Sequence, residues 1–280
     1  MGGQKKLEAK NLIKGAMLQC AEAATFGMPF EVWKTYMGAN RNESTMSAFQ
    51  SVYRSGGARA FWRGIEAKIV ESALKGAVLL FSKEGLMHTS RSLGMGDIAS
   101  GLIGGFGGGV CQVTVMGPCT FLVTASVASH GTTGQMSVME RIGHTLKTQG
   151  VGGFYKGGVA LMLRQGSNWA SRQGITDAVR VQMRSMKSKD ALSVSDEASA
   201  GIIGGCLSTW NQPFEVLRIH AQAAGARGEP SKNIFETSRA IFAESGVRGF
   251  FRGVVPRMGL CVAQTLFMVT IPHILTSKGL

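Results

Sequence analysis

Long apolar runs broken by single charged residues alternate along the chain with short, polar, amphipathic stretches. The apolar runs predict six long helices, at roughly 10–37, 65–87, 97–125, 158–181, 197–224 and 254–277. At about 1.5 Å per residue, each helix is long enough to cross a hydrocarbon core about 30 Å thick. None is apolar all round, because charges such as Lys14, Lys75 and Arg164 interrupt them. Since a charge that faces lipid is costly, we expect the charged faces to line a wet cavity.

The same signals return three times at one period. An aromatic–aromatic–base–Gly motif occurs as FWRG, FYKG and FFRG, at 61–64, 154–157 and 250–253. A proline precedes each copy, at Pro29, Pro118 and Pro213. Three signals in one order predict three repeats of two long helices each, at approximately 8–92, 93–190 and 191–280. We therefore expect an all-α membrane protein in which 1–280 is a single transmembrane domain.

The connections between the helices predict an orientation. Within each repeat roughly 30 residues join the two helices, and their amphipathic patterns predict short helices. These three connections carry 4, 3 and 5 Lys and Arg residues, whereas the two connections between repeats carry 1 and 4. The positive-inside rule places the long connections in the negative compartment. Glycines four residues apart, at Gly101, Gly105 and Gly109 and again at Gly201 and Gly205, predict close helix contacts.

Composition agrees with membrane helices and points to an anionic partner. The chain is 44% hydrophobic and 17% charged, below the ~25% charged that is usual in soluble domains. Its net charge of +13 suits nucleic acid, anionic lipid or anionic solutes. The five cysteines lie in apolar stretches and form no metal-binding cluster, so buried free thiols are expected. The opening MGGQKKLEAK has no signal-peptide core and no Arg/Ser-rich transit helix, so we expect no cleavable presequence.

These motifs resemble those of the mitochondrial carrier family over essentially the whole chain. The pattern P-x-[DE]-x-x-[KR] is intact at Pro29-Glu31-Lys34 and at Pro213-Glu215-Arg218, and aromatic–[KR]–Gly occurs in all three repeats. The resemblance implies a six-helix barrel with pseudo-threefold symmetry that crosses the mitochondrial inner membrane several times. It also implies solute exchange by alternating access, with the long loops in the matrix. We expect a monomer whose partners are small anionic metabolites and membrane lipid.

The resemblance also implies a gate on the matrix side. The expected gate residues are Pro29, Glu31, Lys34, Pro118, Pro213, Glu215 and Arg218. In the family each repeat's acid pairs with the next repeat's base, but here Thr120 and Val123 replace acid and base in the middle repeat. Only the Glu215–Lys34 pair is then expected, which predicts a weak gate or one helped by other contacts. The alternative for Glu31 and Arg218 is that both face water and have no gating role.

Two further sets of residues follow from the repeats. By resemblance, the motifs Trp62-Arg63-Gly64, Tyr155-Lys156-Gly157 and Phe251-Arg252-Gly253 bind cardiolipin; no cofactor is expected, and cardiolipin is the expected bound lipid. Backbone amides at a helix start together with a base suit phosphate; the alternative is a plain turn with an interfacial aromatic anchor. The expected cytoplasmic gate comprises Glu84, Asp177 and Arg180, and only the middle repeat keeps both acid and base. This second gate is therefore expected to be thin.

A register counted from the motif glycine predicts the solute site. Seven residues on stand Glu71, Arg164 and Leu260, and four residues on stand Lys68, Leu161 and Arg257. Unlike groups at matching depth suit an asymmetric solute. The expected substrate-binding set is Glu71, Lys75, Leu79, Arg164, Gln165 and Arg257, with the third contact open between Arg257 and the level of Leu260. Arg172 has no assigned role, and Trp169 is expected to face lipid or a neighbouring helix.

This set resembles the branch of the family that exchanges citrate for 2-oxoglutarate. Arg can bind a carboxylate with two parallel hydrogen bonds, and Lys supplies a point charge. Gln165 is expected to address a keto or hydroxyl oxygen. Glu71 precedes Lys75 in the order that favours an intrahelical pair, so it either holds Lys75 between transport events or takes up a proton. The alternative is that Glu71–Lys75 is only a structural pair.

Other functions have less support in the sequence. Another anionic metabolite or an amino acid remains a candidate solute, because Glu71 could meet an ammonium group. A basic nucleic-acid-binding protein is a remote alternative, because the basic residues form no finger, RRM or basic-helix signature. A soluble enzyme is not expected, since no Walker loop, Ser/His/Asp or HExxH spacing occurs and GLIGGFGGGV fails the dinucleotide test.

Overall fold

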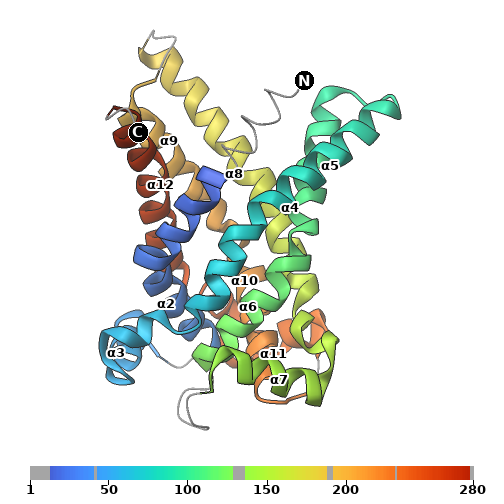
Figure 1. Ribbon diagram of the computed structural model, residues 1–280, viewed down its shortest axis with the longest axis vertical. Helices are drawn as coiled ribbons and strands as arrows, with labels where there is room; N and C mark the ends of the chain where they lie inside the picture. The colour runs from blue at the N-terminus through green and yellow to red at the C-terminus, as the bar shows by residue number, and fades with distance from the viewer. Residues whose placement is uncertain (1–12, 41–42, 129–135, 188–191, 231, 278–280) are drawn as a thin grey trace.

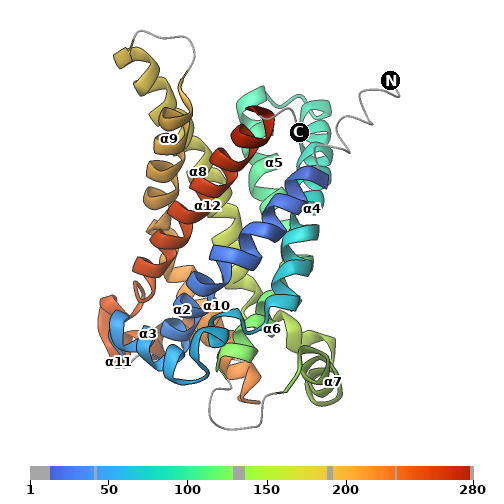
Figure 2. The ribbon, with the colours of Figure 1, turned by 60° about the vertical axis from the view of Figure 1, so that its left-hand side comes forward.

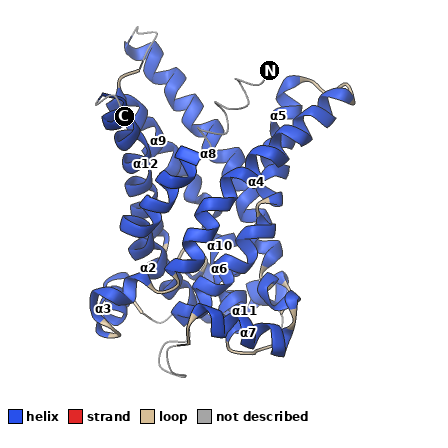
Figure 3. Cartoon of the chain, viewed as in Figure 1, coloured by secondary structure: helices blue, strands red, loops and turns tan. Residues whose placement is uncertain are grey.

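The structure is a computed structural model that describes residues 13–40, 43–128, 136–187, 192–230 and 232–277, and within these ranges it is helical without a strand (Figure 3). The first repeat holds the helix 13–22, η1 (Ala23–Gly27), α2 (Met28–Ala39), α3 (Thr45–Arg54), η2 (Gly57–Trp62) and α4 (Ile65–Ser92). The second holds α5 (Asp97–Cys111), α6 (Val113–Ala128), α7 (Val138–Gln149), η3 (Val151–Tyr155) and α8 (Gly158–Lys187). The third holds α9 (Val194–Leu207), η4 (Ser208–Asn211), α10 (Gln212–Ala226), α11 (Ile234–Gly249) and α12 (Val254–Ser277).

The long helices form a closed ring. Contacts run from α4 to α5, from α5 to α8, from α8 to α9, from α9 to α12, from α12 to α2, and from η1, the turn before α2, back to α4. Figures 1 and 2 show these helices splayed apart where α5 and α9 begin and drawn together where α2, α6 and α10 lie. The short helices α3, α7 and α11 gather at the drawn-together end. The expected six-helix barrel with three short helices is therefore confirmed.

The short helices start where the sequence supplies a capping side chain. The Ser44 side chain accepts a hydrogen bond from the Ser47 N–H at the start of α3. Ser137 and Asn233 each form a reciprocal capping box, with Glu140 and Glu236, at the starts of α7 and α11. These side chains satisfy N–H groups that the first turn of a helix leaves unpaired, and so fix where each short helix begins.

The first long helix of every repeat is broken just before its proline. The break is a π-helical turn at η1, a 43° bend between α5 and α6, and a 3₁₀ turn at η4. Proline has no N–H, so the carbonyl four residues earlier loses its partner. That earlier residue is a threonine each time, Thr25, Thr114 and Thr209, whose hydroxyls donate to carbonyls of the preceding turn at 2.8, 2.9 and 2.6 Å. This recurring threonine, missed in the sequence, stabilises the break.

The aromatic–base–Gly motif joins each repeat to the next. Its glycines, Gly64, Gly157 and Gly253, begin the second long helices with φ of 78°, 74° and 75°. A Cβ added to them would lie 3.1 Å from Val123 Cα, 3.1 Å from Arg218 O and 3.2 Å from Lys34 O, respectively. Positive φ and this close backbone approach both require glycine. Because the contacts run from repeat one to two, two to three and three to one, they confirm the pseudo-threefold arrangement.

The predicted glycine contacts are confirmed at three of five positions. Gly109 faces α8, where an added Cβ would lie 3.0 Å from Trp169 Cδ1. Gly201 and Gly205 face α12, where an added Cβ would meet Thr265 and Cys261. Gly101 and Gly105, in contrast, have open space beside them, so that part of the prediction is wrong. The glycines of α5 that contact α4 are Gly104, Gly107 and Gly108. A run with so many glycines offers several small faces, and spacing alone does not select the one that meets a neighbour.

Hydropathy alone marks few spans. Among the described residues one helix, Val254–Pro272, is long and apolar enough, and the bent pair Ala99–Cys111 with Val113–Ala128 makes a second. The other long helices carry charges that line a central cavity, and these charges lower their hydropathy. The charged faces expected from the sequence thus lie inside the ring.

Candidate solute-binding cavity

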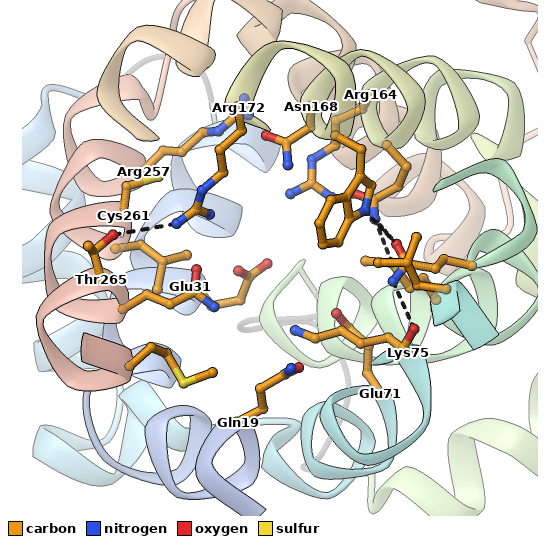
Figure 4. Close-up of a pocket in the computed structure, with 18 of the residues that line it drawn as sticks. Gln19, Glu31, Glu71, Lys75, Arg164, Asn168, Arg172, Arg257, Cys261 and Thr265 are labelled. Atoms are coloured by element: carbon orange, nitrogen blue, oxygen red, sulfur yellow. Dashed lines mark hydrogen bonds between the residues drawn. The ribbon is translucent and has the colours of Figure 1, made fainter. Parts of the chain in front are cut away.

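A cavity of about 480 Å³ lies inside the ring of helices. Its wall runs from Lys34 and Arg218 at the drawn-together end to Arg180 near the splayed end, and side chains of all three repeats contribute (Figure 4). In the described part of the chain eight basic residues line it: Lys34, Lys68, Lys75, Arg164, Arg172, Arg180, Arg218 and Arg257. Two lining residues, Glu31 and Glu71, are acidic. The excess of cations favours an anionic solute.

Glu215 closes the narrow end of the cavity. Its carboxylate is fully buried and lies 2.7 Å from Lys34 Nζ, 2.9 Å from Arg218 Nε and 3.0 Å from Arg164 Nε. The predicted Glu215–Lys34 pair is therefore confirmed, and it joins the third repeat to the first. A buried carboxylate that binds three cations is well compensated for its lost hydration.

Glu31 and Arg218 are buried and ion-paired at the closed end, which argues against the alternative that both face water. Glu31 is 7% exposed and Arg218 is 1% exposed. Glu31 loses its expected partner at Val123 and binds Lys34 of its own helix at 2.9 Å, with Lys68 Nζ at 4.0 Å. Burial forces the carboxylate to find these substitutes within the first repeat. Contacts beyond the Glu215–Lys34 pair thus help to hold the closed end, in agreement with the prediction of a gate helped by other contacts.

A neutral network occupies the place of the missing acid. Arg218 Nη1 donates to Gln222 Oε1 at 2.6 Å, and Gln222 Nε2 donates to Thr120 Oγ1 at 3.0 Å. Thr124 Oγ1 also donates to Gln222 Oε1, at 3.0 Å. Gln222 therefore bridges Arg218 to the middle repeat. Sequence reasoning missed it, although a glutamine one turn beyond Arg218 on the same face is the signal that could have found it.

Glu71 pairs with a different lysine from the one predicted. Lys68 Nζ donates to both Glu71 carboxylate oxygens, at 3.0 and 3.2 Å. Lys75 makes no ion pair with any residue that the structure describes, so the predicted Glu71–Lys75 pair is wrong. The reason is that Lys68 lies between two carboxylates, Glu71 and Glu31, and both attract it. Lys75 is left with its charge facing the cavity (Figure 4).

Arg164 belongs to both the cavity and the closed end. Its Nε lies 3.0 Å from a Glu215 carboxylate oxygen and forms an ion pair with it, but the N–H does not point at that oxygen, so no hydrogen bond forms. Its Nη1 donates a hydrogen bond to Gln165 Oε1 at 2.8 Å. Gln165 Nε2 donates in turn to Gln112 Oε1 and Met116 Sδ, both at 3.0 Å. Both polar atoms of Gln165 are therefore engaged, which corrects its expected contact with a solute oxygen. Its role in this conformation is to orient Arg164.

Gln112 is a cavity residue that sequence reasoning missed. It lies at the bend between α5 and α6, donates to Lys75 O at 2.8 Å and accepts from Trp169 Nε1 at 2.9 Å. Trp169 also lies against Gly109 of α5 and lines the cavity. The expectation that Trp169 faces a neighbouring helix is thus confirmed, and the expectation that it faces lipid is wrong. A lone glutamine six residues before Pro118 in an apolar run was the available signal.

Both candidates for the third contact line the cavity. Arg257 is 4% exposed; its Nη1 donates to Gln212 Oε1 at 2.9 Å and its Nη2 to Asn211 Oδ1. Leu260 lies on the same helix and lines the cavity, as does Leu79 on α4. Neutral amides hold the Arg257 guanidinium in place without cancelling its charge.

The comparisons with known proteins agree with this geometry. The chain matches the family described as "Mitochondrial carrier protein" three times, over residues 6–92, 96–187 and 190–275. It belongs to the mitochondrial carrier family. The chain is 36% identical to the "Citrate/oxoglutarate carrier protein" of Saccharomyces cerevisiae, over 95% of this chain and 88% of the relative. It is 27% identical to the human "Tricarboxylate transport protein, mitochondrial", over 77% and 71% of the two chains. A third relative, the "Mitochondrial substrate carrier family protein Z" of Dictyostelium discoideum, is 25% identical over 89% and 85%.

Among the described residues, the splayed end of this mitochondrial carrier has two ionic contacts between repeats, Arg91–Asp97 at 3.1 Å and Arg180–Glu197. Arg180 binds Asp177 at 3.0 Å on its own helix and Glu197 of α9 at 2.7 Å. Glu197 was not among the predicted gate residues. Glu84 on α4 is exposed and forms no ion pair in the described ranges. The predicted trio therefore does not come together in this open-ended conformation, and the expectation of a thin gate agrees with that.

The bases of the aromatic–base–Gly motifs fasten loops at the closed end of the carrier. Arg63 Nη2 donates to Ser55 O at 3.0 Å, Lys156 Nζ to Glu229 O at 3.1 Å and Arg252 Nη1 to Glu43 O at 3.2 Å. Two motif aromatics donate to carbonyls freed at the helix breaks, Trp62 Nε1 to Ala24 O at 2.7 Å and Tyr155 OH to Thr114 O at 2.9 Å. These contacts give the motif a structural role. A second cavity of about 490 Å³ lies beside the second copy.

Glu43 sits outside the barrel, in the loop after α2. Its carboxylate accepts hydrogen bonds from Ser51 at 2.6 Å, Tyr36 at 2.9 Å and Ser47 at 3.3 Å. The hydrogen bond from Ser51, followed by that from Tyr36, lowers the pKa of the Glu43 carboxyl below its ordinary value. This carboxylate anchors α3 to the end of α2.

Proposed function

We propose that this carrier exchanges citrate for 2-oxoglutarate across the mitochondrial inner membrane by alternating access. The observation that supports it most is the cavity, where eight cations and two carboxylates face a space closed at one end. The Saccharomyces cerevisiae relative is named for the same two solutes. Citrate carries about three negative charges at neutral pH and 2-oxoglutarate two, and both suit such a site. The long loops face the matrix, so the open end of this conformation faces the cytoplasmic side and takes up solute from there. The carrier works as a monomer.

The proposed solute-binding set comprises Lys75, Leu79, Arg164 and Arg257; Gln165 and Glu71 support it as the partners that hold Arg164 and Lys68. Lys75 and Arg257 offer charges without a carboxylate partner among the described residues, and both line the cavity. Arg164 couples binding to gating, because a solute carboxylate that binds its guanidinium competes with Glu215. Once Arg164 is withdrawn, Glu215 keeps two of its three cations, and the closed end is weakened when solute is present. The empty carrier stays closed.

Other anionic metabolites are the runner-up. An amino acid is less well suited, because the Glu71 carboxylate is already bound by Lys68 and is not free for an ammonium group. Reconstituted exchange separates the candidates. Liposomes that contain the purified carrier and internal citrate should take up external citrate and 2-oxoglutarate, and amino acids should not exchange. Absence of both counterflows would contradict the proposed function.

Lys75→Gln tests the site itself. Removal of an unpaired cavity cation should lower citrate exchange at least about tenfold, the size expected for a charge-assisted contact. Lys83→Gln is the matched control, because Lys83 lies two turns further along α4, is exposed and does not line the cavity. Equal activity in Lys75→Gln and the parent would remove Lys75 from the site.

The carrier also binds cardiolipin at the aromatic–base–Gly motifs. The second copy offers the most complete site: Lys156, the glycines at the start of α8 and Lys232 line the cavity of about 490 Å³. A helix start and two ammonium groups suit a phosphate. Added cardiolipin should raise the Tm of the parent in detergent more than that of Lys232→Gln. An equal rise in both would argue for a purely structural motif.

A further inference from the structure

Three cavity cations have no carboxylate partner among the described residues, and each repeat provides one. They are Lys75 on α4, Arg172 on α8 and Arg257 on α12. Each of the other lining cations has a carboxylate partner, since Lys34, Arg164 and Arg218 bind Glu215, Lys68 binds Glu71 and Arg180 binds Asp177 and Glu197. Arg172 stands out because no part of the closed end or of the predicted solute set uses it.

The side chain of Arg172 is presented to the cavity and is weakly held. It points from α8 across the cavity toward α12 (Figure 4), and its one hydrogen bond within the described residues, from Nη2 to Thr265 Oγ1, is long at 3.4 Å. Arg164, Asn168 and Arg172 follow one another at four-residue spacing and form one stripe of α8. Eight residues of helix place Arg172 about 12 Å nearer the open end than Arg164.

In the part of the chain that the structure describes, no acid pairs with this guanidinium. The two lining carboxylates, Glu31 and Glu71, are each bound to lysines near the closed end. Arg172 has five N–H donors in a planar fork that fits a carboxylate with two parallel hydrogen bonds, and a single long bond to a hydroxyl leaves that fork available. Asn168, one turn away, lines the same wall and adds an amide.

We propose that Arg172, oriented by Thr265 and flanked by Asn168, is an outer subsite that binds the third carboxylate of citrate. The inference rests on the proposed function. The two carboxylates that citrate shares with 2-oxoglutarate are bound deeper, by Lys75, Arg164 and Arg257. 2-Oxoglutarate has no third carboxylate and leaves Arg172 with Thr265. Arg172 therefore selects the tricarboxylate over the dicarboxylate.

The test compares two homoexchange reactions in liposomes that contain the purified full chain. Citrate/citrate exchange and 2-oxoglutarate/2-oxoglutarate exchange are measured for the parent, Arg172→Gln, Arg172→Lys and a control, Arg184→Gln. Arg184 lies on the same helix, is exposed and does not line the cavity. Arg172→Gln should raise the KM for citrate about ten- to hundredfold, as for the loss of a charge-assisted contact, and the KM for 2-oxoglutarate at most about threefold. Arg172→Lys should fall between, and Arg184→Gln should match the parent.

Each outcome decides the proposal. An unchanged citrate KM in Arg172→Gln, or equal rises for both solutes, overturns it. A parent that exchanges neither solute overturns the proposed function instead, and that result is seen before any variant is compared. If Arg172→Gln has a lowered Tm and no 2-oxoglutarate exchange, it does not fold correctly. The proposal is then tested with Arg172→Lys and Thr265→Val. Both must raise the citrate KM more than the 2-oxoglutarate KM, and the proposal is wrong if they do not.

Discussion

Two corners of the closed end connect neighbouring repeats in different ways. At the corner between the third and first repeats, Glu215 binds Lys34 at 2.7 Å and gathers two further arginines. At the corner between the second and third repeats, Gln222 and Thr120 make the link through neutral hydrogen bonds. The backbone at the two corners follows the same plan, a helix broken before a proline. The same framework is thus closed by charge in one place and by amide and hydroxyl groups in another.

The difference also shows where the cavity's positive charge comes from. The middle repeat contributes no acid at the gate position, because Thr120 stands there, whereas Arg218 is retained in the third repeat. A neutral partner satisfies the hydrogen bonds of Arg218 but does not cancel its charge. The loss of one gate acid therefore leaves the gate intact and the cavity more cationic, which suits an anionic solute.

The largest effect is expected at the ionic corner. Glu215→Gln should lower the free energy of unfolding by about 3–5 kcal/mol, because three buried cations lose their common carboxylate. In a thermal melt of the detergent-purified carrier this corresponds to a fall in Tm of about 10 °C. Glu31→Gln is the matched variant and should lower the free energy of unfolding by about a third as much. The reason is that Lys34 still forms its ion pair with Glu215, and Lys68 still forms its ion pair with Glu71. Equal losses of unfolding free energy in the two variants would contradict the central role of Glu215 in the ionic corner.

A smaller effect is expected at the neutral corner. Thr120→Val keeps the shape of the side chain and removes the acceptor of the Gln222 Nε2 donor, which should cost about 1 kcal/mol and about 3 °C of Tm. Thr124→Val should cost less, because Gln222 Oε1 still accepts from Arg218. A loss as large as that of Glu215→Gln would erase the contrast between the two corners.

The smallest effect is expected at Glu43, a carboxylate outside the barrel that is held by neutral hydroxyl donors and not by cations as Glu215 is. The pKa of Glu43 is lowered in the folded carrier by the hydrogen bond from Ser51 and then by that from Tyr36. Its stabilising contribution is therefore present above its ordinary pKa and is lost as pH falls through the lowered value. The Tm of the parent should drop between about pH 6 and pH 3.5 by up to about 2 °C more than that of Glu43→Gln. Identical pH profiles would contradict this.

The repeats, the helices and the Glu215–Lys34 pair could be predicted from the sequence because each rests on a local pattern. The partners of Glu31 and Arg218 could not, because the family rule ends where Thr120 and Val123 stand. Their substitutes depend on which buried polar groups lie nearest in space. Lys68 is the substitute partner of Glu31 and Gln222 that of Arg218, and no spacing rule in the sequence predicts either contact.

Lys75 and Gln165 show the same limit within the cavity. Spacing on one helix permits Glu71 to pair with Lys68 or Lys75, and the choice is made by Glu31 on α2. Gln165 is occupied by Gln112, which is placed by a bend that the proline position only approximates. The sequence can therefore indicate which residues share the cavity, whereas the division into bound and unpaired charges needs the positions of neighbouring helices.

The contacts of the motif glycines have a consequence for the transport cycle. Because α12 begins on the backbone of Lys34, α4 on that of Val123 and α8 on that of Arg218, moving any gate segment outward displaces the first turn of the preceding repeat's second helix. The three contacts form a loop without a free end. We therefore expect opening to be concerted, with one transition per solute rather than three independent ones.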